Sequence, residues 1–452
     1  MQHHIQEIWP EGMPRPGIPY SPAIRAGDWL FVSGQSASDL VTGLAAEAVV
    51  PAAFPYYQDA VAKQAAVLYG RVGAIVEAAG AKPEQVVRVN QWYVAGMASP
   101  DYRTGDLTVN NKRYVQEKNR YFTKLSPPST GIGVRGTLVE GALVEADFTA
   151  RLDGDIPEKV SAPGLPKPAA GFAEGVRMGH WVFLSGDLAS DWKGNWGAEA
   201  YDGGGLNGLA PEARTGGLFW GDEPCAKQTD YILSRLSKVA EAAGTSLALA
   251  VKAYVYLADP SDYAAFEDTW AKWFPDTSAA PARILVPNVE IGARGCRVEI
   301  GLDLLMPAAA HLKKPVAGGW SPKSKEPAAV RADDLIFFSG LMATDPGAGL
   351  AAEAAQPPGL PYFGTPGKLQ MRYILQKAKR IAEAAGVDLR QVVKATLYFT
   401  DLRLYAGAME AWAEAFADGH KPAVTAVEIN RGLWVPGCGI MADLTLYDPQ
   451  EA

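Results

Sequence analysis

The chain has 452 residues, of which 48% are hydrophobic and 20% charged, a composition typical of a globular protein with room for about three domains. Its formal net charge of −8 argues against nucleic-acid and anionic-membrane surfaces, because both require clustered Lys and Arg. We therefore expect neither nucleic acid nor a membrane among its partners.

The sequence shows no features of export, membrane insertion or metal binding. No apolar run approaches the roughly 20 residues that span a bilayer, and the start lacks the basic and apolar regions of a secretory signal. Cys225, Cys296 and Cys438 have no CxxC spacing, which suggests a reducing compartment, and the five histidines have no metal-binding spacing. We expect a cytoplasmic protein without a metal or another cofactor.

Three sequence markers recur in the same order, with a period of about 150 residues. The first ends in Ser-Gly (31–34, 183–186, 337–340), the second begins with Gly-Leu-Ala (43–48, 208–213, 349–354), and the third is Glu-Ala-Ala-Gly (77–80, 241–244, 383–386). The chain is therefore one domain in three copies. We place these units at residues 1–153, 154–309 and 310–452, with linkers rich in Pro, Ala and Lys at 157–170 and 307–322.

The second copy shows the predicted elements of one unit in chain order. Residues 171–179 and 181–186 predict two strands, and a glycine-rich loop follows at 194–217. Residues 226–243 have helical spacing, 251–257 alternate as a strand, and Asp259 to Asp262 start a second helix. Strands at 284–291 and 297–305 complete the order β-β-α-β-α-β-β. The equivalent first helices lie at 60–79 and 369–385, and the equivalent third strands at 86–94 and 392–399.

One such unit leaves a face of its sheet to bury, and a neighbouring unit can cover it. Three copies in one chain therefore suggest a closed ring with three-fold pseudo-symmetry. A solenoid is the alternative, although solenoid repeats usually span roughly 20 to 50 residues.

The recurring residues resemble a known family. The stretch from Arg25 through Gly27-Asp28 to Ser33-Gly34, the Glu-Ala-Ala-Gly helix end, Pro281-Ala282-Arg283 and Val298-Glu299-Ile300 are similar to those of the RidA/YjgF/YER057c/UK114 family. The similarity covers nearly the whole chain in three tandem copies.

The resemblance implies both a fold and an activity. It implies α+β units like chorismate mutase, arranged as an intramolecular pseudo-trimer with an inner β-barrel, outer helices and ligand sites between neighbours. Enzymes of that family hydrolyse enamines and imines of amino acids to a 2-keto acid and ammonia. In them, an Arg on the penultimate strand holds the substrate carboxylate, and a Glu on the last strand positions water.

The second copy keeps both family residues, as Arg283 and Glu299. A guanidinium suits a small carboxylate through paired charge-assisted hydrogen bonds, and a carboxylate can activate water against an imine carbon. We expect the two strands to be adjacent and antiparallel, so that both side chains enter one cleft as the catalytic pair. The equivalent positions are Ser129 and Glu145 in the first copy, and Val424 and Met441 in the third.

Other substrate-binding residues follow from the resemblance. They are the Ser-Gly turns and the residues that align with the family's tyrosine and second-helix polar residue: Ser33, Gly34, Ser185, Gly186, Ser339, Gly340, Tyr20, Phe172 and Glu267. Phe172 lacks the tyrosine hydroxyl, Glu267 adds a negative charge, and Gly301 stands where many members have a second acid. The sequence does not decide which neighbouring unit completes the Arg283 cleft.

The first copy suggests a second hypothesis, an anion site formed by Arg135 and Glu145. Arg135 lies an even number of residues after Ser129 and would share its face of a regular strand, close to Glu145. The alternative is an arginine in a solvent-exposed turn. Aromatic loops at 54–57, 218–221 and 360–363 suggest either a lid for a ring-bearing substrate or contacts that seal the ring.

These features leave three functions open. The first is an imine or enamine deaminase acting on a small or ring-bearing carboxylate. The second is a chorismatase-like hydrolase or lyase of a carbocyclic acid, and the third is a non-catalytic protein that binds a small molecule. Ammonia release separates the first from the second, and turnover separates both from the third. Further oligomerisation stays open.

Overall fold

The computed structural model describes residues 5–54, 58–94, 108–154, 156–168, 171–191, 208–216, 223–276, 278–293, 295–316, 326–360 and 362–449. The predicted glycine-rich loop at 194–217 lies mostly outside these residues. So do residues 55–57 and 361 of two aromatic loops and the whole of the loop at 218–221.

Each unit contains two helices and a mixed sheet. The first comprises β1 (Ile5–Ile8), β2 (Ala23–Ala26), β3 (Trp29–Gln35), α1 (Ala60–Ala78), β4 (Val86–Val94), α2 (Thr108–Tyr121), β5 (Ser129–Val134), β6 (Gly136–Thr137) and β7 (Val144–Arg151). The second comprises β8 (Glu158–Val160), β9 (Gly175–Met178), β10 (Trp181–Leu188), α3 (Pro224–Ala242), β11 (Ala250–Leu257), α4 (Tyr263–Trp273), β12 (Ala282–Val286), β13 (Glu290–Ile291) and β14 (Val298–Leu305).

The third unit repeats this order with a broken second strand of its hairpin. It comprises β15 (Lys313–Val316), β16 (Ala329–Ala332), β17 (Leu335–Phe338), β18 (Leu341–Met342), β19 (Thr344–Asp345), β20 (Gly349–Leu350), α5 (Pro366–Ala384), β21 (Val392–Phe399), α6 (Tyr405–Ala415), β22 (Ala423–Glu428) and β23 (Ile440–Tyr447). The predicted helices and third strands agree with these bounds to within a few residues.

Two predictions need correction. The segments expected to be linkers each contain an edge strand, since β8 pairs with β9 and β15 pairs with β16, both antiparallel. The strand predicted at 284–291 is interrupted, because Asn288 adopts a left-handed backbone with φ 57°. At that point the neighbouring unit docks: the Asn430 amide donates to the Asn288 carbonyl at 3.0 Å.

Short strands cross from one unit to the next. β13 of the second unit pairs with β5 of the first, and β6 of the first pairs with β22 of the third. Together with the Asn430–Asn288 bond, these pairs link all three units in a cycle. Among the described residues no sheet closes on itself: there are three open sheets of six to eight strands and a separate small ribbon, so the expected single closed barrel is not observed.

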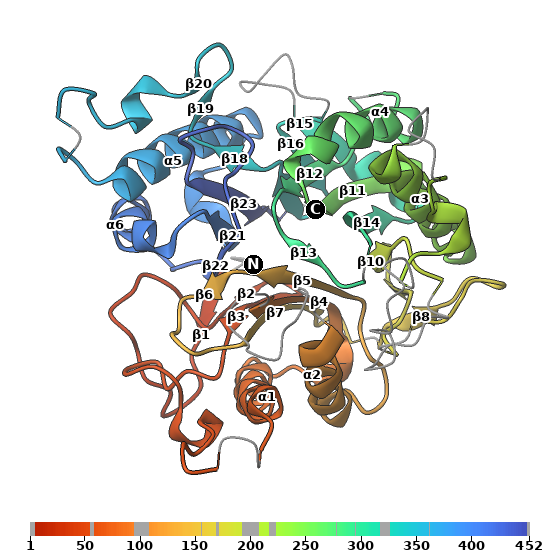
Figure 1. The fold of residues 1–452 in the computed structure, drawn as a ribbon, viewed down its shortest axis with the longest axis horizontal. Coiled ribbons are helices and arrows are strands. Elements are labelled where there is room, and N and C mark those ends of the chain that lie inside the picture. The colour runs from red at the N-terminus through yellow and green to blue at the C-terminus, as the bar shows by residue number, and fades with distance from the viewer. Residues whose placement is uncertain are drawn as a thin grey trace.

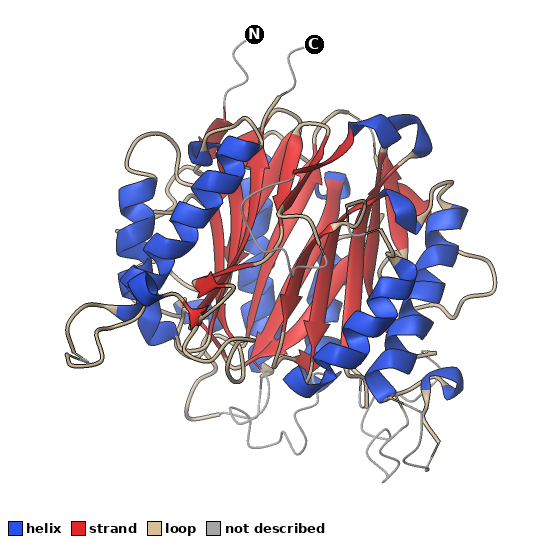
Figure 2. Ribbon diagram, turned by 90° about the horizontal axis from the view of Figure 1, so that it is seen from above, coloured by secondary structure: helices blue, strands red, loops and turns tan. Residues whose placement is uncertain are grey.

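The sheets lie inside and the helices outside. Figure 1 shows the three units around a common centre, with α1 and α2, α3 and α4, and α5 and α6 at the periphery. Figure 2 shows the strands filling the middle of the molecule between outer helices. No helix within the described ranges is long and apolar enough to cross a membrane.

The side chains of strand β3 alternate between the two faces of its sheet, which explains this arrangement. Leu30 and Val32 belong to the core of the first unit beneath its helices, whereas Trp29 and Phe31 belong to a core shared by all three units. The equivalent Phe183 and Phe337 join the same shared core. The phenylalanine two residues before each Ser-Gly serine therefore packs the three sheets against one another. This packing places the Ser-Gly turns at the junctions between units.

Candidate functional site

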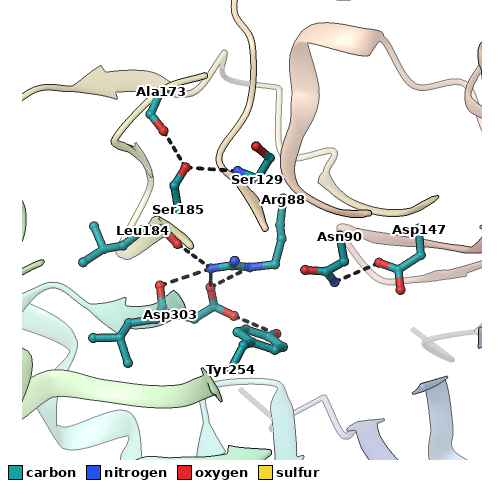
Figure 3. Close-up of polar contacts among 10 residues, drawn as sticks. Arg88, Asn90, Ser129, Asp147, Ala173, Leu184, Ser185, Tyr254 and Asp303 are labelled. Carbon is teal, nitrogen blue, oxygen red and sulfur yellow. Dashed lines mark hydrogen bonds and ion pairs between the residues drawn. The ribbon is translucent and has the colours of Figure 1, made fainter. Parts of the chain in front are cut away.

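The serine of each Ser-Gly turn ties one unit to the next. The Ser185 hydroxyl donates to the Ala173 carbonyl at 2.6 Å and accepts the Ser129 amide of the first unit at 3.0 Å (Figure 3). Ser33 does the same between Ser21 and Val424, and Ser339 does so between Pro327 and Arg283. The hydroxyls are thus engaged in holding the units together, and ligand contacts from these turns would fall to the backbone.

The glycine after each serine permits a side chain to approach closely. A Cβ at Gly34 would collide with Glu145 Oε1, and a Cβ at Gly186 would collide with Glu299 Oε1. At Gly340 the same atom would lie 2.8 Å from Ile284 Cδ1 and 3.6 Å from Met441 Sδ. Each turn therefore faces the family glutamate position of its own unit.

These contacts define three equivalent junctions between units. The Glu145 junction joins Gly34 and Glu145 of the first unit to Val424 of the third. The Glu299 junction joins Gly186 and Glu299 of the second unit to Ser129 of the first. The Arg283 junction joins Gly340 and Met441 of the third unit to Arg283 of the second. The third unit therefore completes the Arg283 cleft. None of the three junctions combines the family arginine with the family glutamate.

The expectation that Arg283 and Glu299 share a cleft is wrong. β12 and β14 are not adjacent, because β11 lies between them, parallel to β12 and antiparallel to β14. Arg283 is level with Ala253 of β11, and Glu299 is level with Tyr256. Residues three apart on a strand face opposite sides of the sheet, so the two side chains point away from each other.

Arg283 is neutralised by carboxylates of the protein. Its Nη2 lies 2.6 Å from Glu267 Oε1 and 2.8 Å from Glu326 Oε2, and the guanidinium stacks over Phe266 and Trp270. Burial alone would lower the pKa of Arg283, but the carboxylates of Glu326 and Glu267 outweigh it and raise that pKa. A substrate carboxylate would have to compete with two acids at this position.

The Glu299 side chain is buried next to the Ser185-Gly186 turn. Its Oε1 accepts the Gly131 amide of the first unit at 3.3 Å. Burial raises the pKa of Glu299 to about 8 against the opposing effect of the Gly131 amide, and Asp187 adds a smaller upward contribution. Phe172 lies at the same junction, where the Lys118 ammonium is 5.9 Å from its ring centre.

Glu145 lines a cavity. The cavity has a volume of about 430 Å³ and is lined from the first unit by Tyr20, Gly34, Arg71 and Glu145, and from the third by Tyr405 and Val424. Burial raises the pKa of Glu145 to about 8, assisted by Asp147 and opposed by the Ala426 amide. At neutral pH this carboxyl is therefore mostly protonated, and it can donate a proton into the cavity.

Arg135 is not brought together with Glu145 as a second anion site. It follows the end of β5, its side chain is 64% exposed, and its Nη1 pairs with Glu428 Oε1 at 3.3 Å. This is the solvent-exposed turn arginine of the alternative interpretation. Of the aromatic loops, Leu360, Tyr362 and Phe363 are exposed.

Two features were missed from the sequence. Arg71, on α1, lines the Glu145 cavity, and its helix position holds a cation in every unit, as Arg235 and Lys377 show. That recurrence could have identified it. Tyr405, the first residue of α6, also reaches the cavity, but its counterpart Tyr263 is 45% exposed and gave no reason to single it out.

A ring of buried ion pairs on the inner surface was missed as well. Each joins a cation of one unit to an aspartate of another: Arg88 to Asp303, Lys252 to Asp443, and Lys394 to Asp147. Figure 3 shows Arg88 reaching Asp303 and the Leu184 carbonyl, with Tyr254 donating to the same aspartate. Each of these strands has a β-bulge next to the cation. The bulge lets two successive side chains, such as Val87 and Arg88, both face the centre of the molecule.

The described residues offer no metal centre: no three His, Cys, Asp or Glu side chains among them are arranged to hold an ion. All three cysteines are buried and unpaired with one another. The junctions contain carboxyl, guanidinium and phenol groups, as in Glu145, Arg71 and Tyr20.

Comparisons with known proteins agree with the three-fold repeat. The profile of the family described as Endoribonuclease L-PSP matches residues 11–152, 163–303 and 324–433. A RutC family protein of Pyrococcus horikoshii is 34% identical over 103 residues, which are 23% of this chain and 72% of that protein. A 2-iminobutanoate/2-iminopropanoate deaminase of Dermatophagoides farinae is 26% identical over 141 residues, 31% of this chain and 90% of that protein.

Other similar proteins cover either one unit or two. The chloroplastic Reactive Intermediate Deaminase A of Arabidopsis thaliana is 26% identical over 137 residues, which are 30% of this chain and 61% of that protein. A solved YjgF/YER057c/UK114 family structure from Mycobacterium tuberculosis is 23% identical, covers 33% of this chain and 99% of its own, and has a TM-score of 0.24. A solved chorismatase is 19% identical, covers 66% of this chain and 80% of its own, and has a TM-score of 0.40.

Proposed function

Since this chain belongs to the RidA/YjgF family, the family described as Endoribonuclease L-PSP, we propose that it is an enamine or imine deaminase whose working site is the Glu145 cavity. The observation that carries the proposal is a family glutamate, buried and mostly protonated at neutral pH, on the wall of a cavity of about 430 Å³ between two units. Two of the similar proteins are named as deaminases of this type.

The chemistry requires a group that both donates and accepts a proton. Protonated Glu145 gives its proton to the enamine carbon, which forms an iminium ion. The resulting carboxylate takes a proton from water as the new C–O bond forms and the C=N π bond breaks. Glu145 then gives this proton to the carbinolamine nitrogen, the C–N bond breaks to release ammonia, and the hydroxyl returns a proton to Glu145 as the C=O bond of the 2-keto acid forms.

This proposal moves the site away from the pair expected from the sequence. Arg283 is satisfied by Glu267 and Glu326, and Glu299 faces a different unit from Arg283. We also propose that the three units act as a single-chain counterpart of a three-subunit ring, in which two junctions became structural. RNA cleavage fits poorly with a net charge of −8.

The test is ammonia release from short-lived enamines generated in situ, with both a 2-aminoacrylate-type substrate and one that carries a large apolar side chain. We expect the wild type to accelerate release and Glu145→Gln to lose about 100-fold or more of that acceleration. The matched control is Glu299→Gln, which removes an equally buried glutamate from another junction and should keep most of the activity.

Three outcomes contradict the proposal in different ways. Full activity in Glu145→Gln would move the site elsewhere, and a selective loss in Glu299→Gln would place it at the Glu299 junction. Absence of any acceleration by the wild type with both substrates would remove the deaminase assignment. Hydrolysis of a carbocyclic acid without ammonia would instead indicate a chorismatase-like enzyme.

A further inference from the structure

The cation at the twelfth position of each first helix has a shared structural role. Arg71 donates from Nη1 to the Ser36 carbonyl at 3.1 Å and from Nη2 to the Ser38 carbonyl. Arg235 donates to the Ser190 carbonyl, and Lys377 donates to the Met342 carbonyl at 2.6 Å. In every unit this cation thus fastens the segment that follows the Ser-Gly turn.

The units differ in what neutralises that cation. In the second unit Arg235 Nε lies 3.1 Å from Asp187 Oδ2, and Asp187 directly follows the Ser-Gly turn. In the first unit the equivalent residue is Gln35, whose amide donates to the Ser33 carbonyl. Within the described ranges Arg71 makes no ion pair of its own. The Asp39 and Glu47 carboxylates act on it only at longer range, and Glu140 and Glu145 share the cavity lining with it, so no carboxylate of the described residues pairs directly with its guanidinium.

The segment beyond the turn is held rigidly beside Arg71. The Asp39 carboxylate accepts the amides of Val41, Thr42 and Gly43, and the Ser38 hydroxyl accepts the Leu40 amide. Leu40 has a φ of 68°, a strained conformation for a residue with a branched side chain. This network maintains the strain and brings Leu40 and Val41 to the cavity lining.

Much of the remaining wall is apolar and partly open to solvent, although Ser36, Thr42 and Glu140 also belong to it. Ile18 and Leu138 line the cavity and are each 39% exposed, and Val41 is 74% exposed. Exposed apolar side chains gathered at one cavity favour an apolar ligand group. The volume of about 430 Å³ also lies within the usual range for pockets that bind whole small molecules, roughly 300 to 1,000 Å³.

We propose that Arg71 holds the carboxylate of the ligand and that Ile18, Leu40, Val41 and Leu138 select a large apolar side chain. The substrate class is then the enamine or imine of a branched or aromatic amino acid, and the product is the matching 2-keto acid. This inference rests on the proposed function for its chemistry, but the binding it describes is independent of turnover. Arg71 supplies from a helix the guanidinium that Val424 no longer provides from the strand.

Binding of stable 2-keto acids measures the inference directly. Phenylpyruvate and pyruvate are titrated calorimetrically into the full-length wild type, Arg71→Lys and Arg71→Met. We expect phenylpyruvate to bind more tightly than pyruvate, with a loss of about tenfold in Arg71→Lys and about 100-fold in Arg71→Met, because the paired hydrogen bonds of the guanidinium are lost first and the charge second. Lys377 shows that a lysine at this helix position still fastens the strand segment.

The control and a second variant separate anchoring from folding. Arg235→Lys makes the same exchange in the second unit and should leave phenylpyruvate binding unchanged. Val41→Ser alters an exposed side chain and should weaken phenylpyruvate but not pyruvate. Unchanged phenylpyruvate binding in both Arg71 variants would overturn the anchor, and equal affinity for the two keto acids would overturn the apolar selection.

The results also distinguish this inference from the proposed function. Binding of phenylpyruvate that depends on Arg71, without ammonia release by the wild type, would support the anchor and contradict the deaminase. Ammonia release that depends on Glu145, without any loss in the Arg71 variants, would support the deaminase and contradict the anchor. Failure of the wild type to bind either keto acid would also overturn the anchor.

Discussion

Two sets of equivalent positions have diverged to different extents in this chain. On the inner surface a cation–aspartate pair is kept at all three contacts between units: Arg88–Asp303, Lys252–Asp443 and Lys394–Asp147. At the junctions, none of the three keeps both the family arginine and the family glutamate. A ring needs every contact to hold together, whereas one working site suffices for activity, so structural positions are constrained in every copy and ligand positions are not.

The largest effect on stability is expected from breaking the inner ring. Lys252→Met leaves Asp443 buried without its principal cation, and burial already raises the pKa of that aspartate against the effect of Lys252. We expect a loss of about 3 to 5 kcal/mol in the free energy of unfolding, measured by urea denaturation.

The same exchange in the third unit tests the equivalence of the ring. Lys394→Met should cost a similar amount, because Asp147 is equally buried. Lys379→Met, which removes an exposed lysine 3.9 Å from Glu383, should cost less than about 0.5 kcal/mol. A loss below about 1 kcal/mol for both buried lysines would mean that the ring does not depend on these pairs.

A smaller effect is expected at the Arg283 junction, where the third unit provides the comparison. Met409 and Val424 of that unit occupy the positions of Glu267 and Arg283. Arg283→Val should therefore destabilise the protein by about 3 kcal/mol, since it leaves Glu267 buried without its cation.

The double variant Glu267→Met/Arg283→Val reproduces the third unit's apolar pair in the second. It should regain most of that loss, because apolar residues of similar volume often replace a buried ion pair at little cost. Neither variant should change ammonia release once the protein is folded. A loss of activity in a folded double variant would return Arg283 to the catalytic site.

Much of the fold could be predicted from the sequence because the repeat shows each element three times. The helices predicted at 60–79 and 226–243 correspond to α1 and α3, since their apolar spacing and terminal glycines are local features. The edge strands β8 and β15 were missed because they are short and are defined only by their pairing with the next strand. The break at Asn288 depends on contact with another unit, which local sequence does not contain.

The site was harder to predict, for a topological reason. The sequence predicts an arginine and a glutamate on consecutive strands, and consecutive strands are commonly neighbours in a sheet. The structure inserts β11 between β12 and β14, which sends Arg283 and Glu299 to opposite faces. Arg71 was missed because a cation on an amphipathic helix normally faces solvent, and only the fold shows that it lines a cavity.

The buried glutamates at the two remaining junctions predict a pH dependence. The pKa of Glu145 and that of Glu299 are both raised from 4.5 to about 8, mainly by burial. The folded state therefore binds more protons than the unfolded state between these values. This contribution to stability is complete below about pH 4.5 and is lost as the pH rises through about 8.

Replacing either glutamate by glutamine removes one titrating group, so the difference in bound protons between the folded and unfolded states becomes smaller. Glu299→Gln should flatten the decline in unfolding free energy between pH 5 and pH 8 by about 3 kcal/mol, and Glu145→Gln should do so to a similar extent. Denaturation at several pH values measures both. A wild-type stability that does not decline across this range would contradict the raised pKa values.

The smallest effect is expected for Arg135→Ala, which tests the contrast between Arg71 and Arg135 of the first unit. Arg135 is 64% exposed and pairs with Glu428 at 3.3 Å on the surface, so its removal should cost at most about 0.5 kcal/mol. Phenylpyruvate affinity should be unchanged, because this charge lies outside the cavity that Glu145 and Arg71 share. A tenfold loss of affinity in Arg135→Ala, with full binding in Arg71→Lys, would reverse the two roles and place the anion site on the strand rather than on the helix.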